Sequence, residues 1–372
     1  MKLNRSLLLA LFALLALSLT ACGRAPATNW PGLATDGSAL YLAEGQKIYA
    51  VQLTDGTDKM IASGDKQVAL RYPLDNQTTA FYAPPTILPN GQMVIGNASQ
   101  SEFSLFWYDL ASGTQARAFD GVKKPWFAGA ISVGEDFFIP AGDGNLYAFT
   151  MDGQQRWKFA ASAHALWTTP VSDGVTLFLG TLDHQLYAIN AESGQQTWKI
   201  DLDNGIIGAP ALMNGTLYVG TLSGELYAIN AADGVILWQK ALIGGIWSAP
   251  ALNAEGSTLY IGTVNGTAGK FYLVNAQTGD ILRTIDEAKG SITASPLVLP
   301  DQVIYVTDTG SIVWITPTGD PIRQPVVLEN AKLYVAPVLV NDLVIVAPMN
   351  YPNLLVAYDL NGAQKWAYTP AK

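Results

Sequence analysis

The chain has 372 residues, of which 49% are hydrophobic and 14% are charged. This composition supplies ample apolar material for a large core and carries little charge for a globular protein. The formal net charge of −9 opposes binding to phosphate backbones, so we expect no nucleic-acid partner. The single cysteine excludes an intramolecular disulfide and a metal site built from several thiolates.

The N-terminal segment has the features of a targeting sequence. Lys2 and Arg5 precede an apolar stretch over 7–19, which is too short for a comfortable membrane span and is typical of a signal peptide. The following residues LTAC (19–22) resemble the lipobox of bacterial lipoproteins, in which the chain is cut before the cysteine and the cysteine is lipidated. The resemblance implies a signal peptide over 1–21, a lipidated Cys22 and a short tether over 22–29. The alternative is an ordinary signal peptide that ends in a chance cysteine.

The sequence contains an internal repeat. The segments QLYAINAESGQQTWKIDL (185–202) and ELYAINAADGVILWQKAL (225–242) have nearly the same sequence. Eight copies align on a turn glycine, with intervals of 40 to 45 residues in the central part of the chain. The eight glycines are Gly56, Gly113, Gly153, Gly194, Gly234, Gly279, Gly319 and Gly362. A second element precedes each copy, as in GAPALMNGTLYVGTLS (208–223).

Each repeat unit predicts four short strands. The apolar runs are five to seven residues long and are separated by turn residues, and no stretch shows a sustained helical period. Four strands at a period near 40 residues are typical of a β-propeller blade. We therefore predict an all-β fold over 30–372, an eight-bladed β-propeller of four-stranded antiparallel blades. A solenoid is the alternative, but it needs polar capping repeats, and the last unit is as apolar as the middle ones.

A column of large side chains stands four residues after the turn glycine. Its tryptophans are Trp157, Trp198, Trp238 and Trp366, and Arg occupies the position in three other units. A flat indole on an outer strand can pack across to the neighbouring blade and bury a large area, and an Arg stem can bury itself in a similar way. We interpret this column as structural docking between blades.

The pattern Tyr-Ala-Ile-Asn-x-x-x-Gly-x-x-x-Trp resembles the tryptophan-docking repeat of the eight-bladed quinoprotein-type propellers. The resemblance covers essentially all of 30–372. Two groups share that repeat: the PQQ-dependent alcohol and glucose dehydrogenases, and the BamB-like lipoproteins, which are non-catalytic scaffolds in the assembly of outer-membrane barrels. The motif is specific for the fold and much weaker for the function.

Candidate catalytic chemistry is sparse. The quinoprotein enzymes hold PQQ with calcium beneath a disulfide between adjacent cysteines and use an Asp base, and we match none of these residues in this chain. His184 lies in a turn and His164 in a connecting loop, and neither has a nucleophile motif beside it. We therefore predict no catalytic residue, no metal and no cofactor. A PQQ-dependent dehydrogenase with calcium and an extracellular sensor or solute-binding module remain the alternatives.

A second column is a candidate partner-binding site. It stands three residues before the inner-strand Pro or its equivalent, in the loop that enters the innermost strand of a propeller blade, near one mouth of the central channel. Its members are Tyr82, Phe127, Trp167, Ile207, Trp247, Thr293 and Tyr334. The five aromatic residues could form an apolar ring of the kind that marks a partner site. The alternative is packing between adjacent blades.

One irregularity interrupts the repeat. The segment between the first two units is 13 residues longer than the matching segment between central units. Long insertions in compact repeats can be functional loops, and linkers or family drift are the alternatives.

Together these features predict a BamB-like lipoprotein that acts as a protein-binding scaffold. We expect a membrane contact through the lipid, a membrane or envelope protein as partner, and a monomer within a complex. The location is expected to be the periplasmic side of the outer membrane, or the outer face of the cell membrane in an organism with one membrane.

Overall fold

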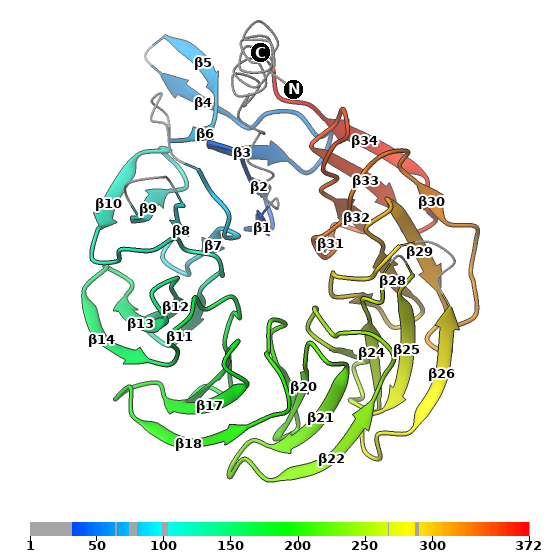
Figure 1. The fold of residues 1–372 in the computed structure, drawn as a ribbon. Coiled ribbons are helices and arrows are strands. Elements are labelled where there is room, and N and C mark those ends of the chain that lie inside the picture. Colours follow the sequence, from blue (N-terminus) through cyan, green and yellow to red (C-terminus); the bar gives the residue numbers. More distant parts are fainter. Residues whose placement is uncertain are drawn as a thin grey trace, which may run out of the picture.

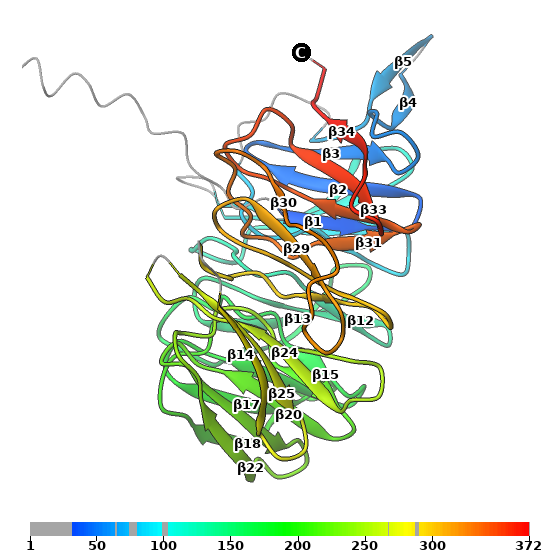
Figure 2. The ribbon, with the colours of Figure 1, turned by 90° about the vertical axis from the view of Figure 1, so that its right-hand side faces the viewer.

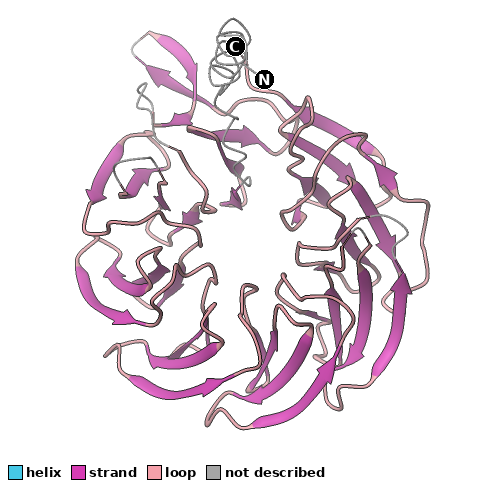
Figure 3. Ribbon diagram, in the orientation of Figure 1, coloured by secondary structure: helices cyan, strands magenta, loops and turns pink. Residues whose placement is uncertain are grey.

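The computed structural model describes residues 32–371 apart from 64, 74–79, 99–102, 267 and 287–289. The predicted signal peptide (1–21), Cys22 and the tether lie outside these residues. The described chain forms a ring of eight four-stranded antiparallel sheets, seen along the ring axis in Figure 1 and from the side in Figure 2. None of the described residues belongs to a helix long and apolar enough to cross a membrane. The predicted eight-bladed all-β propeller is confirmed (Figure 3).

The first four blades follow the chain order. Their strands are β1 (Gly32–Thr35), β2 (Ala39–Glu44), β3 (Lys47–Gln52) and β6 (Arg71–Tyr72); β7 (Thr86–Ile87), β8 (Gln92–Gly96), β9 (Leu105–Asp109) and β10 (Gln115–Phe119); β11 (Ile131–Val133), β12 (Asp136–Pro140), β13 (Asn145–Thr150) and β14 (Gln155–Ala160); β15 (Val171–Ser172), β16 (Thr176–Gly180), β17 (Gln185–Asn190) and β18 (Gln196–Asp201).

The last four blades repeat the plan. Their strands are β19 (Ala211–Met213), β20 (Thr216–Gly220), β21 (Glu225–Asn230) and β22 (Ile236–Ala241); β23 (Ala251–Leu252), β24 (Thr258–Gly262), β25 (Lys270–Asn275) and β26 (Ile281–Asp286); β27 (Leu297–Val298), β28 (Val303–Val306), β29 (Ser311–Ile315) and β30 (Val326–Val327); β31 (Val338–Val340), β32 (Leu343–Val346), β33 (Leu355–Asp359) and β34 (Gln364–Tyr368).

The core lies between blades. Successive side chains of a strand point to opposite faces, and here each face meets a neighbouring blade. On β17, Leu186 and Ala188 pack with blade 5, whereas Tyr187 and Ile189 pack with blade 3. The middle strands are therefore buried on both faces, which explains their continuous apolar runs. Each fully buried Leu or Ile contributes about 1.5–3 kcal/mol relative to an exposed one.

The antiparallel strand order gives the ring two different faces. The turns between first and second strands and between third and fourth strands lie at one end of each blade, which we call the turn face. The turns between second and third strands lie at the other end, together with the crossing loops that lead from an outer strand to the next innermost strand. We call this end the loop face. It carries the column of Tyr82, Phe127, Trp167, Trp247 and Tyr334.

The insertion of the first repeat forms a β-hairpin. Its strands β4 (Met60–Ser63) and β5 (Lys66–Ala69) pair only with each other in the described part of the chain, and the hairpin projects from the edge of the ring (Figures 1 and 2). Ile61 packs against the buried cluster that joins blades 1 and 2. The extra residues are therefore an ordered extension of the first blade.

Among the described residues, no strand is exchanged where the ring closes between blade 8 and blade 1. Each of these blades is a continuous segment of the described chain, and their apolar side chains share one buried cluster. The Trp366 indole donates a hydrogen bond to the Leu53 carbonyl oxygen at 3.1 Å, and the Tyr368 hydroxyl donates one to Asp58 Oδ1 at 2.7 Å. Side-chain docking therefore supplies the closure.

Candidate partner-binding face

The tryptophan column lies at the blade junctions. The indole Nε1 atoms of Trp157, Trp198 and Trp238 donate hydrogen bonds of 3.0–3.1 Å to a backbone carbonyl of the next blade. Each indole also covers the turn glycine of that blade. A Cβ atom added to Gly194, for example, would lie 2.5 Å from Trp157 Cδ2. The glycine is thus needed for its positive φ of 69° and for the space that the indole occupies.

Arg283 makes the equivalent junction with polar contacts. Its guanidinium Nη1 donates hydrogen bonds to the Thr318 carbonyl oxygen at 3.0 Å and to Asp320 Oδ1 at 2.7 Å. Both acceptors belong to the turn of the next blade. The position therefore joins blades in either form, and its side chains face the turn and the outer rim of the ring, away from the channel mouth.

In the crossing loops on the loop face, a buried side chain is followed by an exposed side chain. In each of two loops a fully buried residue, Leu166 or Ile246, precedes an exposed tryptophan, Trp167 or Trp247. Ile246 packs where a neighbouring glycine leaves room, because a Cβ on Gly220 would lie 2.3 Å from Ile246 Cγ2. The next side chain must then point out of the core. Trp167 is 41% exposed and Trp247 is 37% exposed.

The structure divides the predicted aromatic ring into two parts. In the first part the rings of Phe127 and Trp167 stack at a centroid distance of 4.1 Å and an angle of 8°, and Tyr82 meets Phe127 edge-on at 6.5 Å. These three residues belong to consecutive crossing loops. They form an aromatic row that is partly packed within itself and partly open to solvent.

In the second part, Trp247 and Tyr334 line a cavity of about 420 Å³ together with Thr293 of the same column. Other walls come from Asp308 and Met349 in turns of blades 7 and 8 and from Lys332 in the crossing loop between these blades. Burial raises the pKa of the Tyr334 hydroxyl, with a further contribution from the Asp308 carboxylate. This cavity offers both aromatic surface and charged groups to a partner. Ile207 lies between the two parts.

Polar pairs hold the crossing loops against the blades that they enter. Ser162 Oγ donates a hydrogen bond to Asp183 Oδ2 at 2.6 Å. In the next blade the aspartate lies in the loop and the serine in the turn, and Ser223 Oγ donates to Asp203 Oδ2. The Ser291 amide donates to Asp308 Oδ1 at 2.7 Å. The repeated contact links a loop to the turn between second and third strands. It fixes the loops that carry the aromatic residues.

The two histidines lie on the same face but in different settings. His164 Nδ1 is 2.5 Å from Asp183 Oδ1, so the structure supplies the carboxylate that the neighbouring sequence lacks. The Ser162 hydroxyl and His164 hold the pKa of the Asp183 carboxyl below its usual value. His184 is exposed in a turn with a φ of 67°. Among the described residues, no three His, Cys, Asp or Glu side chains form a group that could hold a metal ion.

Glu44 is a half-buried carboxyl at the loop-face end of β2, and burial raises its pKa to about 7 from 4.5. A folded-state pKa above the unfolded value favours folding below pH 4.5, and this contribution is lost as the pH rises through 7. Glu44→Gln should therefore raise Tm at about pH 8 and leave it unchanged at about pH 4. Thermal melts at both pH values test this, with the exposed Glu192→Gln as control. An equal effect at both pH values would contradict it.

Comparisons with known proteins support the interpretation of the repeat. The model of the family described as "Outer membrane protein assembly factor BamB" matches residues 142–304, from the third blade to the seventh. No curated protein matches the sequence. Similar solved structures include BamB from Moraxella catarrhalis, with 16% identity over 92% of this chain and 94% of that chain and a TM-score of 0.67.

Two further structures show how widely the fold occurs. The computationally designed Ika8 protein has 12% identity over 93% of this chain and 98% of that chain, with a TM-score of 0.70. Sqt1 from Saccharomyces cerevisiae has 15% identity over 91% and 95%, with a TM-score of 0.65. At these identities the likeness concerns the fold alone. Residues 142–304 thus match the model of the family described as outer membrane protein assembly factor BamB, within a chain that folds as an eight-bladed β-propeller.

Proposed function

We propose that this protein is a non-catalytic scaffold that binds a membrane or envelope protein through its loop face. The observation that carries the proposal is the pair of exposed tryptophans, Trp167 and Trp247, on crossing loops held by the packed ring. Aromatic side chains on a fixed frame are efficient anchors for a partner, because little conformational entropy is lost on binding. The match to an outer membrane protein assembly factor supports a scaffold of this kind.

The proposal includes a lipid anchor at Cys22. The support is the sequence LTAC (19–22) after a basic and apolar leader. A lipid would hold the acidic propeller beside the bilayer. A partner held at the same membrane would then have a raised effective concentration. We propose a location on the periplasmic side of an outer membrane, or on the outer face of the cell membrane where only one membrane is present, as a monomer within a complex.

Replacing Trp167 and Trp247 together by Ala should reduce partner capture at least tenfold with little effect on folding. Truncation of an anchor residue at the centre of an interface typically weakens binding by 2 kcal/mol or more, which is about thirtyfold in affinity. Truncation of a partly exposed side chain typically lowers the free energy of unfolding by about 1 kcal/mol. The measurement is a mild-detergent pull-down from native membranes, quantified by mass spectrometry and accompanied by a thermal melt. Val175→Ala, an exposed apolar residue on the turn face, is the control.

Three outcomes would contradict the proposal. Loss of folding in the double variant would show that the tryptophans serve blade packing. Undiminished capture would show that the loop face is not the binding surface. Saturable quenching of tryptophan emission by PQQ with calcium would favour a quinoprotein.

A further inference from the structure

The turn face of blades 5 and 6 has an apolar surface that the rest of the repeat does not predict. Ile236 and Leu237 begin the outer strand of blade 5, Val235 directly precedes it, and Ile281 and Leu282 begin the outer strand of blade 6. All five are between 41% and 56% exposed. At the positions of 236 and 237, blade 3 has Gln155 and Arg156, blade 4 has Gln196 and Thr197, and blade 8 has Gln364 and Lys365. We call these five residues the blade 5–6 patch.

The position of Leu237 explains its exposure. The pairing of β21 with β22 shifts register so that Trp238 lies opposite Ala228 and Ile236 lies opposite Ile229. Leu237 is the bulged residue between them, and it therefore has no cross-strand partner in that pairing. The same register shift occurs between β13 and β14 and between β17 and β18. The backbone is thus common to the repeat. Two adjacent large aliphatic side chains at the positions of 236 and 237 occur only in blades 5 and 6, whereas blade 7 has Pro321 and Ile322, of which Ile322 is 39% exposed.

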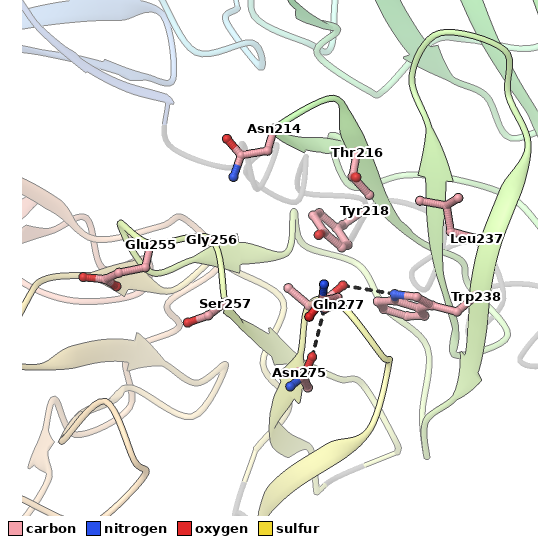
Figure 4. Close-up of a pocket in the computed structure, with 11 residues that line it drawn as sticks. Asn214, Thr216, Tyr218, Leu237, Trp238, Glu255, Gly256, Ser257, Asn275 and Gln277 are labelled. Atoms are coloured by element: carbon pink, nitrogen blue, oxygen red, sulfur yellow. Dashed lines mark hydrogen bonds between the residues drawn. The ribbon is translucent and has the colours of Figure 1, made fainter.

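A cavity of about 400 Å³ opens beside the patch. Leu237, Trp238 and Tyr218 form its apolar side, and Asn214, Glu255 and Gln277 lie on its polar side (Figure 4). The Trp238 indole is held in place by its hydrogen bond to the Ala276 carbonyl oxygen at 3.0 Å. The cavity walls therefore come from a fixed blade junction, with one exposed leucine at the entrance.

The junction of blades 3 and 4 provides an internal comparison. It has a cavity of the same volume, about 400 Å³, at the equivalent place. There Arg156 occupies the position of Leu237, and its guanidinium Nη1 forms an ion pair with Asp136 Oδ2 at 2.8 Å. An exposed charge at an outer strand opposes apolar association. Blade 5 lacks this charge, because the exposed side chains of β22 are Ile236, Leu237, Gln239 and Ala241.

The charges around the patch select the occupant. Among the described residues, the lining of the blade 5–6 cavity includes Glu255 and no Lys or Arg, and the adjoining turns contribute Asp233 and Asp280. Arg283, which follows Leu282, is paired with Asp320 of blade 7 at 2.7 Å. A second copy of the chain would bring these acidic groups against each other, and an anionic bilayer would be repelled by them. An apolar segment flanked by basic residues would make apolar contacts with the patch and would be attracted by the acidic residues around it.

We propose that the blade 5–6 patch binds an extended, apolar segment of a partner protein flanked by Lys or Arg, with one apolar side chain in the cavity beside Leu237. This surface lies on the turn face, opposite the loop face that carries Trp167 and Trp247. It is therefore a second interaction surface, and its existence does not depend on the function proposed for the loop face.

The test uses the full-length protein and a fluorescein-labelled peptide, Lys-Val-Leu-Val-Leu-Val-Lys, in an anisotropy titration at low salt. We expect saturable binding by the wild type and at least tenfold weaker binding by Leu237→Arg, which reproduces the blade 3 residue. Thr197→Arg makes the matched change in blade 4 and should leave the affinity unchanged. Glu255→Gln should weaken binding about threefold, and a peptide with Glu in place of Lys should bind at least tenfold more weakly.

Leu237→Thr, which introduces the blade 4 residue, gives a second variant without a new charge and should also bind several-fold more weakly. Circular dichroism and Tm should be those of the wild type, because Leu237 is exposed. Absence of saturable binding, equal binding by Leu237→Arg, or equal binding of the Glu-flanked peptide overturns the proposal. A concentration-dependent dimer or phosphatidylglycerol vesicle binding that Leu237→Arg abolishes would also overturn it, in favour of a second copy or a membrane. Replacing Trp167 and Trp247 by Ala should not change the peptide affinity.

Discussion

Trp366→Ala should lower the free energy of unfolding by about 3–5 kcal/mol, the range for removal of a buried tryptophan. Trp366 is 8% exposed and belongs to the cluster shared by blades 8 and 1. Its indole also donates the hydrogen bond to the Leu53 carbonyl oxygen and covers Gly56. The described chain has no strand that crosses this junction, so the docked side chains carry the closure of the ring.

The matched variant is Trp198→Ala, which removes the same contact from the junction of blades 4 and 5. Those blades are also linked by the crossing loop 202–210, so loss of the indole there cannot separate them. We expect a smaller loss, about 2–3 kcal/mol, which corresponds to the lower part of the range for large core truncations. Urea unfolding measures both values, and limited proteolysis reports opening at the junction of blades 8 and 1. Equal losses and equal protease resistance would show that closure does not depend on this docking.

Gly194→Ala should cost about 3 kcal/mol or more, whereas Gly215→Ala should cost about 1 kcal/mol. Both residues have positive φ, 69° and 74°, and a Cβ in this region costs about 1–2 kcal/mol. Apart from Gly215 and its two chain neighbours, no heavy atom of the described structure lies within 4 Å of a Cβ added to Gly215, whereas at Gly194 the Cβ would overlap the Trp157 indole. The additional overpacking costs about 1–3 kcal/mol.

Thermal and urea unfolding of the two variants separate the backbone strain from the clash with the indole. A double variant, Gly194→Ala with Trp157→Ala, should lose less stability than the sum of the two single variants, because the smaller side chain at 157 leaves room for the new methyl group. The explanation fails if the two glycine variants lose the same stability or if the double variant is additive.

The fold was predictable because its information is local and repeated. An apolar strand that reads Tyr-Ala-Ile-Asn in two units, the turn glycine and the large residue four positions later recur through the chain, and each unit folds into one blade. Of the two reasons for the turn glycine, the positive φ and the space for the indole, only the first was predictable. Positive φ follows from the turn sequence, but the indole that fills the space above Gly194 comes from the preceding blade.

The closure of the ring and the insertion were not predictable to the same degree. Closure depends on how blade 8 meets blade 1, a contact between segments some 300 residues apart, and no repeat pattern describes it. The sequence left a functional loop, a linker and family drift open for the insertion in the first unit, and the structure shows there the hairpin of β4 and β5. Its two strands pair with each other and lie outside the period of the repeat.

In the candidate sites, too, the local sequence patterns were predictable and the contacts between blades were not. The aromatic column followed from the spacing before the inner-strand Pro, but its two parts depend on contacts between loops of different blades, such as the Phe127–Trp167 stack. The pairing of His164 with Asp183 joins residues from two blades, and neither segment alone indicates it. The blade 5–6 patch is visible in the sequence only when the outer strands are compared position by position.

Site-specific photocrosslinking in native membranes tests the central claim most directly. A benzophenone side chain would replace Trp247 on the loop face in one variant and Val175 on the turn face in another. A scaffold that binds through its loop face should form an adduct with one fixed envelope protein from position 247 and none with that protein from position 175. No adduct from position 247, or the same adduct from both positions, would contradict the proposed function.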